Sequence, residues 1–74
     1  MDAAIAEPAI KACLKEIHTR LKEAASIAKA ASACADAGNA DKGVEVALDI
    51  EQLLHDARGL LGAASMLNRL VREE

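Results

Sequence analysis

The side chains best suited to nucleophilic or metal chemistry in this 74-residue chain are two histidines and two cysteines. Metal ligands on helices need i,i+3 or i,i+4 spacing, and several must converge. Glu51 and His55 form one such pair, whereas Cys13 and His18 lie five residues apart and diverge on a helix. The chain has no Gly-rich phosphate loop and no nucleophile beside a base. We therefore expect no metal, no cofactor and no enzymatic activity.

One short run, Leu54 to Ala63, resembles known families. Its His-x-x-Arg-Gly pattern resembles the His-x-x-Lys-Gly signature of histidine phosphotransfer domains. His-Asp-x-Arg-Gly followed by Leu-Gly-Ala resembles the phosphoacceptor helix of histidine-kinase dimerisation hairpins. The resemblance implies an exposed helical His55 that carries a phosphoryl group beside a glycine that makes room for a response regulator. A solvated His55 between Glu51 and Arg58 on a polar stripe is the simpler interpretation. A phosphotransfer carrier remains the first alternative function.

A second candidate surface is a basic row on the first predicted helix, where Lys15, Lys22 and Lys29 recur every seven residues. The row resembles the RNA-binding face of small helical-hairpin dimers that regulate plasmid copy number. The interleaved Glu16 and Glu23, the net charge of −3 and the absence of aromatic side chains argue against a nucleic-acid partner. An RNA-binding hairpin dimer is the second alternative.

The elements that hold these side chains are predicted by two apolar ladders with alternating three- and four-residue spacing. The first ladder comprises Ile10, Leu14, Ile17, Leu21, Ala24, Ala28, Ala31 and Ala35, and the second comprises Val46, Ile50, Leu53, Ala57, Leu60, Ala64, Leu67 and Val71. Gly38 and Asn39 separate them and suit a turn. We predict an all-α antiparallel helical hairpin that forms a single domain over 1–74. Its first helix covers about 7–37, its turn 38–40 and its second helix about 41–72.

The two ladders are complementary when they are paired across the turn. Ala31 then lies opposite Val46 and Leu21 opposite Ala57, so that most layers set a large residue against alanine. Such alternation keeps the layer volume nearly constant, as close packing requires. Gly59 and Gly62 interrupt the second helix, and we expect them to mark close backbone packing.

Apolar residues outside the ladders predict a second interface. The second helix carries a further stripe of Ala47, Leu54 and Leu61, and the first contributes Ile27 on its flank. This apolar surface is wider than a two-helix seam needs. We therefore predict a homodimer in which two hairpins form a four-helix bundle, with Ala47, Leu54, Leu61 and Ile27 at the dimer interface.

Charge, cysteine content and hydropathy bound the function. Between Pro8 and Ala35 five bases stand against two acids, and between Asp41 and Glu74 seven acids stand against four bases, so we expect the two helices to attract each other and to leave little net field for an outside partner. Cys13 and Cys34 are separated by about 30 Å on one helix and cannot bridge within a chain. If two first helices met antiparallel across a dimer axis near Glu23 and Ala24, Cys13 of one chain would approach Cys34 of the other. No apolar run spans a bilayer, so we expect no membrane contact and a reduced, cytoplasmic protein. The sequence favours a small non-catalytic dimer that acts as a protein–protein interaction or regulatory module.

Overall fold

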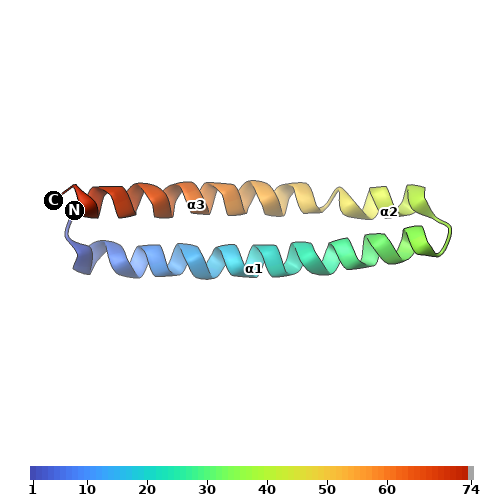
Figure 1. Ribbon diagram of the computed structural model, residues 1–74, viewed down its shortest axis with the longest axis horizontal. Helices are drawn as coiled ribbons and strands as arrows, with labels where there is room; N and C mark the ends of the chain where they lie inside the picture. Colours follow the sequence, from blue (N-terminus) through green and yellow to red (C-terminus); the bar gives the residue numbers. More distant parts are fainter. Residues whose placement is uncertain (74) are drawn as a thin grey trace.

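The computed structural model describes residues 1–73 as two antiparallel helical arms joined by a tight turn (Figure 1). One arm is α1, Ala3–Asp36; the other contains α2, Ala40–Ala47, and α3, Ile50–Arg72. The two ends of the chain lie side by side at the end of the hairpin opposite the turn (Figure 1). This arrangement confirms the predicted all-α helical hairpin.

Helix α1 begins four residues earlier than the predicted boundary near Glu7. Asp2 caps it, because its side-chain Oδ1 accepts a hydrogen bond of 3.0 Å from the backbone N–H of Ala4. Pro8 therefore lies inside the helix, in its second turn, rather than at its start. The preference of proline for a first turn predicts the later start near Glu7, but the capping side chain of Asp2 sets the boundary at Ala3.

The turn follows the predicted Gly38–Asn39 break. Gly38 adopts a left-handed backbone with φ of 88°, a conformation that favours glycine. The N–H of Gly38 donates to the carbonyl of Ala35 and the N–H of Asn39 to that of Cys34, the bond pattern of a Schellman C-cap. The Asn39 side chain then accepts a bond of 3.3 Å from the Lys42 N–H and caps α2. One residue pair thus ends one helix and starts the next.

The second arm is interrupted at Leu48 and Asp49, where one continuous helix over 41–72 was expected. The N–H of Asp49 donates to Val46 and the N–H of Glu51 to Leu48, so that two i→i−3 bonds tighten the backbone between α2 and α3. Helix α3 runs without a break through both of its interior glycines. A Cβ atom added at Gly59 or Gly62 would meet nothing within 4 Å, so the expected close packing at these glycines is wrong within the chain.

Close backbone approach occurs at Gly43 instead. A Cβ atom at this position would lie 2.7 Å from the backbone oxygen of Ala31, closer than real Cβ contacts allow. Ala31 therefore lies against Gly43 rather than opposite Val46 as predicted, and the helices meet a fraction of a turn away from the predicted register. The absence of a side chain at Gly43 lets α1 and α2 approach closely just after the turn.

The seam between the arms follows a heptad pattern, in which positions a and d face the partner helix. The second ladder is confirmed, because all eight of its residues are buried or half-buried. The first ladder is half wrong: Ile10, Ile17, Ala24 and Ala31 occupy the a positions, but Leu14 and Leu21 are exposed. The heptad spacing and the burial assign the central d positions of α1 to Cys13, Arg20, Ile27 and Cys34, each of which is half-buried.

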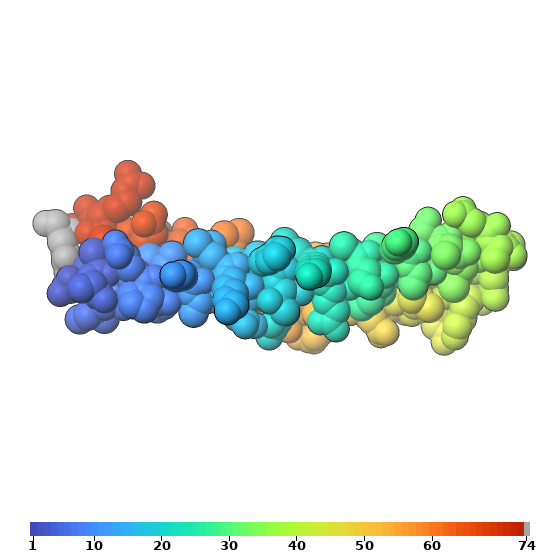
Figure 2. All heavy atoms as spheres, turned by 90° about the horizontal axis from the view of Figure 1, so that it is seen from below, coloured from blue at the N-terminus to red at the C-terminus, as the bar shows by residue number. Residues whose placement is uncertain are grey.

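Small residues form the buried core. The buried apolar residues among those described are Ala6, Ala24, Ala31, Ala57 and Ala64, and no large apolar side chain is fully buried. The molecule is a thin rod with extents of 56 × 14 × 12 Å (Figure 2). Its radius of gyration of 16.9 Å far exceeds the value of about 11 Å expected for a compact domain of this length. A single hairpin therefore leaves most of its large apolar side chains partly in water.

Candidate interaction surface

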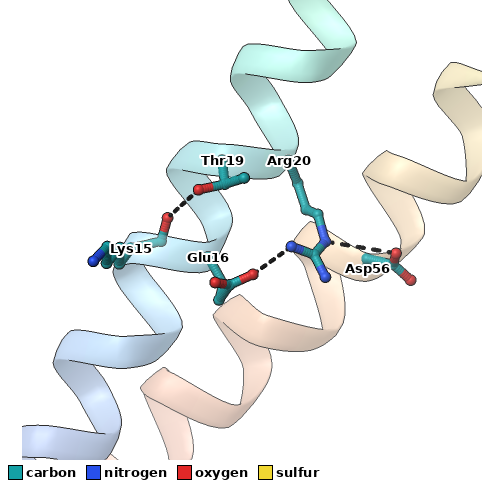
Figure 3. A network of polar contacts seen from close by, with 5 residues as sticks. All are labelled: Lys15, Glu16, Thr19, Arg20 and Asp56. Atoms are coloured by element: carbon teal, nitrogen blue, oxygen red, sulfur yellow. Dashed lines mark hydrogen bonds and ion pairs between the residues drawn. The ribbon is translucent and has the colours of Figure 1, made fainter.

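One polar cluster joins the two arms at mid-length (Figure 3). Arg20 lies at a seam position on α1, and its guanidinium donates to Glu16 on the same helix. Its Nε lies 3.8 Å from Oδ2 of Asp56 on α3, while the Oδ1 of that carboxylate accepts a bond of 2.9 Å from Gln52. The cluster interrupts an otherwise apolar seam with charges of opposite sign.

This cluster identifies which sides of the two helices share a face of the hairpin. Glu16 and Asp56 both occupy heptad position g, and both lie next to Arg20. In an antiparallel helix pair, the g positions of both helices lie on one side and the e positions of both lie on the other. The e positions must therefore lie together on the face opposite the Arg20 cluster.

The face made by the e positions is apolar along most of its length. We call it the leucine face, and its residues are Leu14, Leu21, Ala28, Ala35, Ala40, Ala47, Leu54 and Leu61. Its four leucines are 53%, 45%, 49% and 58% exposed in that order, and of its alanines only Ala47 is half-buried. Side chains from both arms thus form one apolar surface with no charge in it.

The predicted interface residues divide between this face and the seam. Leu54, Leu61 and Ala47 lie on the leucine face, whereas Ile27 is half-buried at a seam position. Leu14 and Leu21 belong to the leucine face, whereas the ladder spacing predicts them at the seam. Their neighbours Cys13 and Arg20 repeat with the same spacing one residue earlier, so periodicity alone does not distinguish the two sets.

His55 is exposed on the outer side of α3. It lines a shallow open depression together with Arg20, Asp56, Gly59 and Leu60, on the same side of the hairpin as the polar cluster. The open space beside the Gly59 backbone belongs to this depression. The histidine is therefore accessible and lies on a different face from the leucines.

The other predicted features are separated from one another. Lys15, Lys22 and Lys29 all occupy position f, on the outer side of α1, and are exposed. Cys13 and Cys34 are free thiols at half-buried seam positions. Within residues 1–73, no three His, Cys, Asp or Glu side chains gather as a metal site would require. Within the same range, no helix is long and apolar enough to cross a membrane.

Comparison of the chain with protein-family models, with curated proteins and with solved structures found no match.

Proposed function

We propose that this chain is a non-catalytic helical hairpin that homodimerises through the leucine face into a four-helix bundle and serves as an interaction or regulatory module. The observation that supports this proposal most strongly is the exposure of four leucines on one uncharged face. Soluble monomers rarely expose a contiguous apolar surface of this kind, and such surfaces commonly mark interaction sites.

The area of the hairpin supports a partner. Its accessible surface is 5455 Å², whereas a compact monomer of 7.7 kDa exposes roughly 4300 Å². The excess of roughly 1100 Å² resembles the roughly 800 Å² that each partner buries in a stable interface of standard size. A dimer that covers the leucine face would bring the exposed surface per chain close to the ordinary value.

The test of this proposal is Leu54→Lys. Because a symmetric dimer contains this change twice, it loses the burial of two leucines, roughly 3 kcal/mol in total, and we expect the dimer dissociation constant to rise about 100-fold. Met66→Lys is the matched control, since Met66 is 54% exposed but lies off the leucine face, at position c. Light scattering over a concentration series should show dissociation for Leu54→Lys alone. Equal effects of the two variants would contradict the proposal.

A phosphotransfer carrier is the second candidate, and the depression beside His55 favours it. Arg20 lines the same depression, together with Asp56, and an arginine beside an acceptor histidine can pair with phosphoryl oxygens. Acetyl phosphate can serve as the phosphoryl donor. In that transfer, an imidazole nitrogen of His55 forms a bond to phosphorus while the bond between phosphorus and the acetate oxygen breaks.

Incubation with labelled acetyl phosphate tests this second candidate. It should label the chain at an acid-labile site that His55→Gln removes. His18→Gln, which alters an exposed histidine on the other arm, should leave the labelling intact. Absence of label, or label that survives His55→Gln, would contradict a carrier role.

A further inference from the structure

We infer that the leucine face is covered by a second copy of this chain that lies antiparallel to the first, with the turn of each hairpin directed toward the chain ends of its partner. The inference rests on the proposed homodimer and specifies how its two copies are arranged. It comes from the order of large and small side chains along the face and from the register between the arms.

The leucine face has a bulky half and a small half. The contacts between Ala31 and Gly43 and between Arg20 and Asp56 set the register of the arms. Counted from these contacts, Leu14 lies level with Leu61 and Leu21 level with Leu54, in the half nearer the chain ends. By the same count the half nearer the turn holds only alanines, in the level pairs Ala28 with Ala47 and Ala35 with Ala40. The change from leucine to alanine occurs at the same level on both arms.

A twofold axis at this level places every leucine on an alanine. When the axis passes between residues 24 and 25 of α1, Leu14 meets Ala35 of the second copy and Leu21 meets Ala28. The register places this axis between residues 50 and 51 of the other arm, where Leu54 meets Ala47 and Leu61 meets Ala40. Each arm taken separately therefore requires the same axis. Large against small in every layer is the arrangement that fills the space between helices evenly.

The opposite arrangement, with both turns at one end, packs poorly. It would place four leucines in each layer of one half and four alanines in each layer of the other. The leucine layers would force the helices apart, and the alanine layers would leave voids between them. Uniform helix spacing therefore favours the antiparallel dimer.

The limits of the face agree with this axis. One heptad beyond Leu14 and Leu61, toward the chain ends, the same two rows continue with Glu7 and Asn68. The axis places both of these levels beyond the turn of the second copy, where they face water. Polar residues thus occur where cover by the partner ends.

Distances between spin labels measure the orientation directly. Single cysteines at Lys22→Cys and Asp36→Cys, in a chain that carries Cys13→Ala and Cys34→Ala, place labels at exposed f positions away from the face. In the antiparallel dimer, the two copies of a residue are displaced along the helix direction by about 3 Å for each residue between that position and the twofold axis. This displacement is about 8 Å at position 22 and about 35 Å at position 36. In the opposite arrangement, the two copies are not displaced along the helix direction at either site. We expect a much longer distance at position 36 than at position 22.

Cross-linking tests the same orientation in the unaltered chain. When equal amounts of ¹⁴N- and ¹⁵N-labelled chain are mixed, a mixed-isotope Lys15–Lys29 cross-link must join two copies. In the antiparallel dimer, Lys15 of one copy and Lys29 of the other are about 8 Å apart along the helix direction, whereas in the opposite arrangement they are about 21 Å apart along it. If the chain has the mass of a dimer but shows equal label distances at the two sites and no mixed-isotope cross-link, the antiparallel orientation is wrong. The homodimer would still be supported. A monomer mass would overturn the homodimer as well.

Discussion

Two glycines in the second arm lie in opposite environments, and this difference belongs to the residue scale. Gly43 lies against the backbone oxygen of Ala31, while Gly62 lies beside open space. The Gly43→Ala change adds a methyl group that the neighbouring backbone cannot accommodate without moving, so we expect it to lower the free energy of unfolding by about 1–3 kcal/mol. Urea unfolding at one protein concentration measures this effect.

Gly62→Ala is the matched control for that change. It introduces the same methyl group on a helix with no atom nearby, so the usual helix preference for alanine should raise the free energy of unfolding by up to about 1 kcal/mol. A stabilised Gly43→Ala variant would show that the arms do not approach closely at Ala31.

Arg20 contributes both packing and charge to the seam. Its stem occupies a position otherwise held by apolar residues, and its guanidinium lies between the carboxylates of Glu16 and Asp56. Since its side chain is 32% exposed, we expect Arg20→Ala to cost about 1 kcal/mol of unfolding free energy. Arg20→Leu, which keeps the packing volume, should be at least as stable as the unaltered chain.

A chemical-unfolding comparison of the two Arg20 variants separates the roles. Lys22→Ala, which removes an exposed positive charge on the outer side of the same helix, should change stability by less than about 0.5 kcal/mol. If Arg20→Leu lost as much stability relative to the unaltered chain as Arg20→Ala, the polar cluster rather than the packing would dominate at this position.

At the scale of the elements, the start of α1 depends on Asp2. This residue caps the helix, and the nearby terminal ammonium of Met1 donates a bond of 3.0 Å to the Leu70 carbonyl on the other arm. Asp2→Ala leaves the first helical N–H groups without this acceptor, so we expect a loss of about 1 kcal/mol in unfolding free energy and faster hydrogen exchange near Ala4. Asp36→Ala, at the other end of α1, removes an acid from a helix C-terminus and should be neutral or slightly stabilising. Equal losses from the two variants would contradict a capping role.

The sequence was sufficient to predict the helical hairpin, its turn and the seam of the second arm. Gly38 has the conformational freedom that the turn needs. The second ladder is apolar along its whole length, whereas the neighbouring row through Leu54 and Leu61 continues with Asn68. On α1, two sets repeat with the same spacing one residue apart, and apolarity alone favours the set with Leu14 and Leu21. The structure places Arg20 in the seam instead, because its stem packs there while Asp56 on the other arm compensates its charge.

The same ambiguity affects the half of the candidate interface that α1 contributes, Leu14 and Leu21. Leu54 and Leu61 lie outside a well-defined ladder and so indicate an interface, whereas the spacing of Leu14 and Leu21 predicts core positions for them. The pairing of Arg20 with Asp56 reveals that the four leucines share one face, and the register across the turn sets which of them lie level. That register depends on the close approach at Gly43, which the spacing of apolar residues does not encode.

At the scale of the whole molecule, the hairpin is a thin rod whose buried core consists of alanine and whose leucines lie outside. A small domain of this length normally needs additional burial or a staple to be stable. Its two cysteines are both free, so no disulfide provides one within the chain. The leucine face is therefore where the missing burial can be gained.

Sedimentation equilibrium of the unaltered chain at micromolar concentration tests the central claim most directly. Dimerisation through the leucine face predicts a mass twice the 7.7 kDa of one chain, with dissociation toward the single-chain mass only on dilution. A stable mass of one chain across that concentration range would contradict the claim.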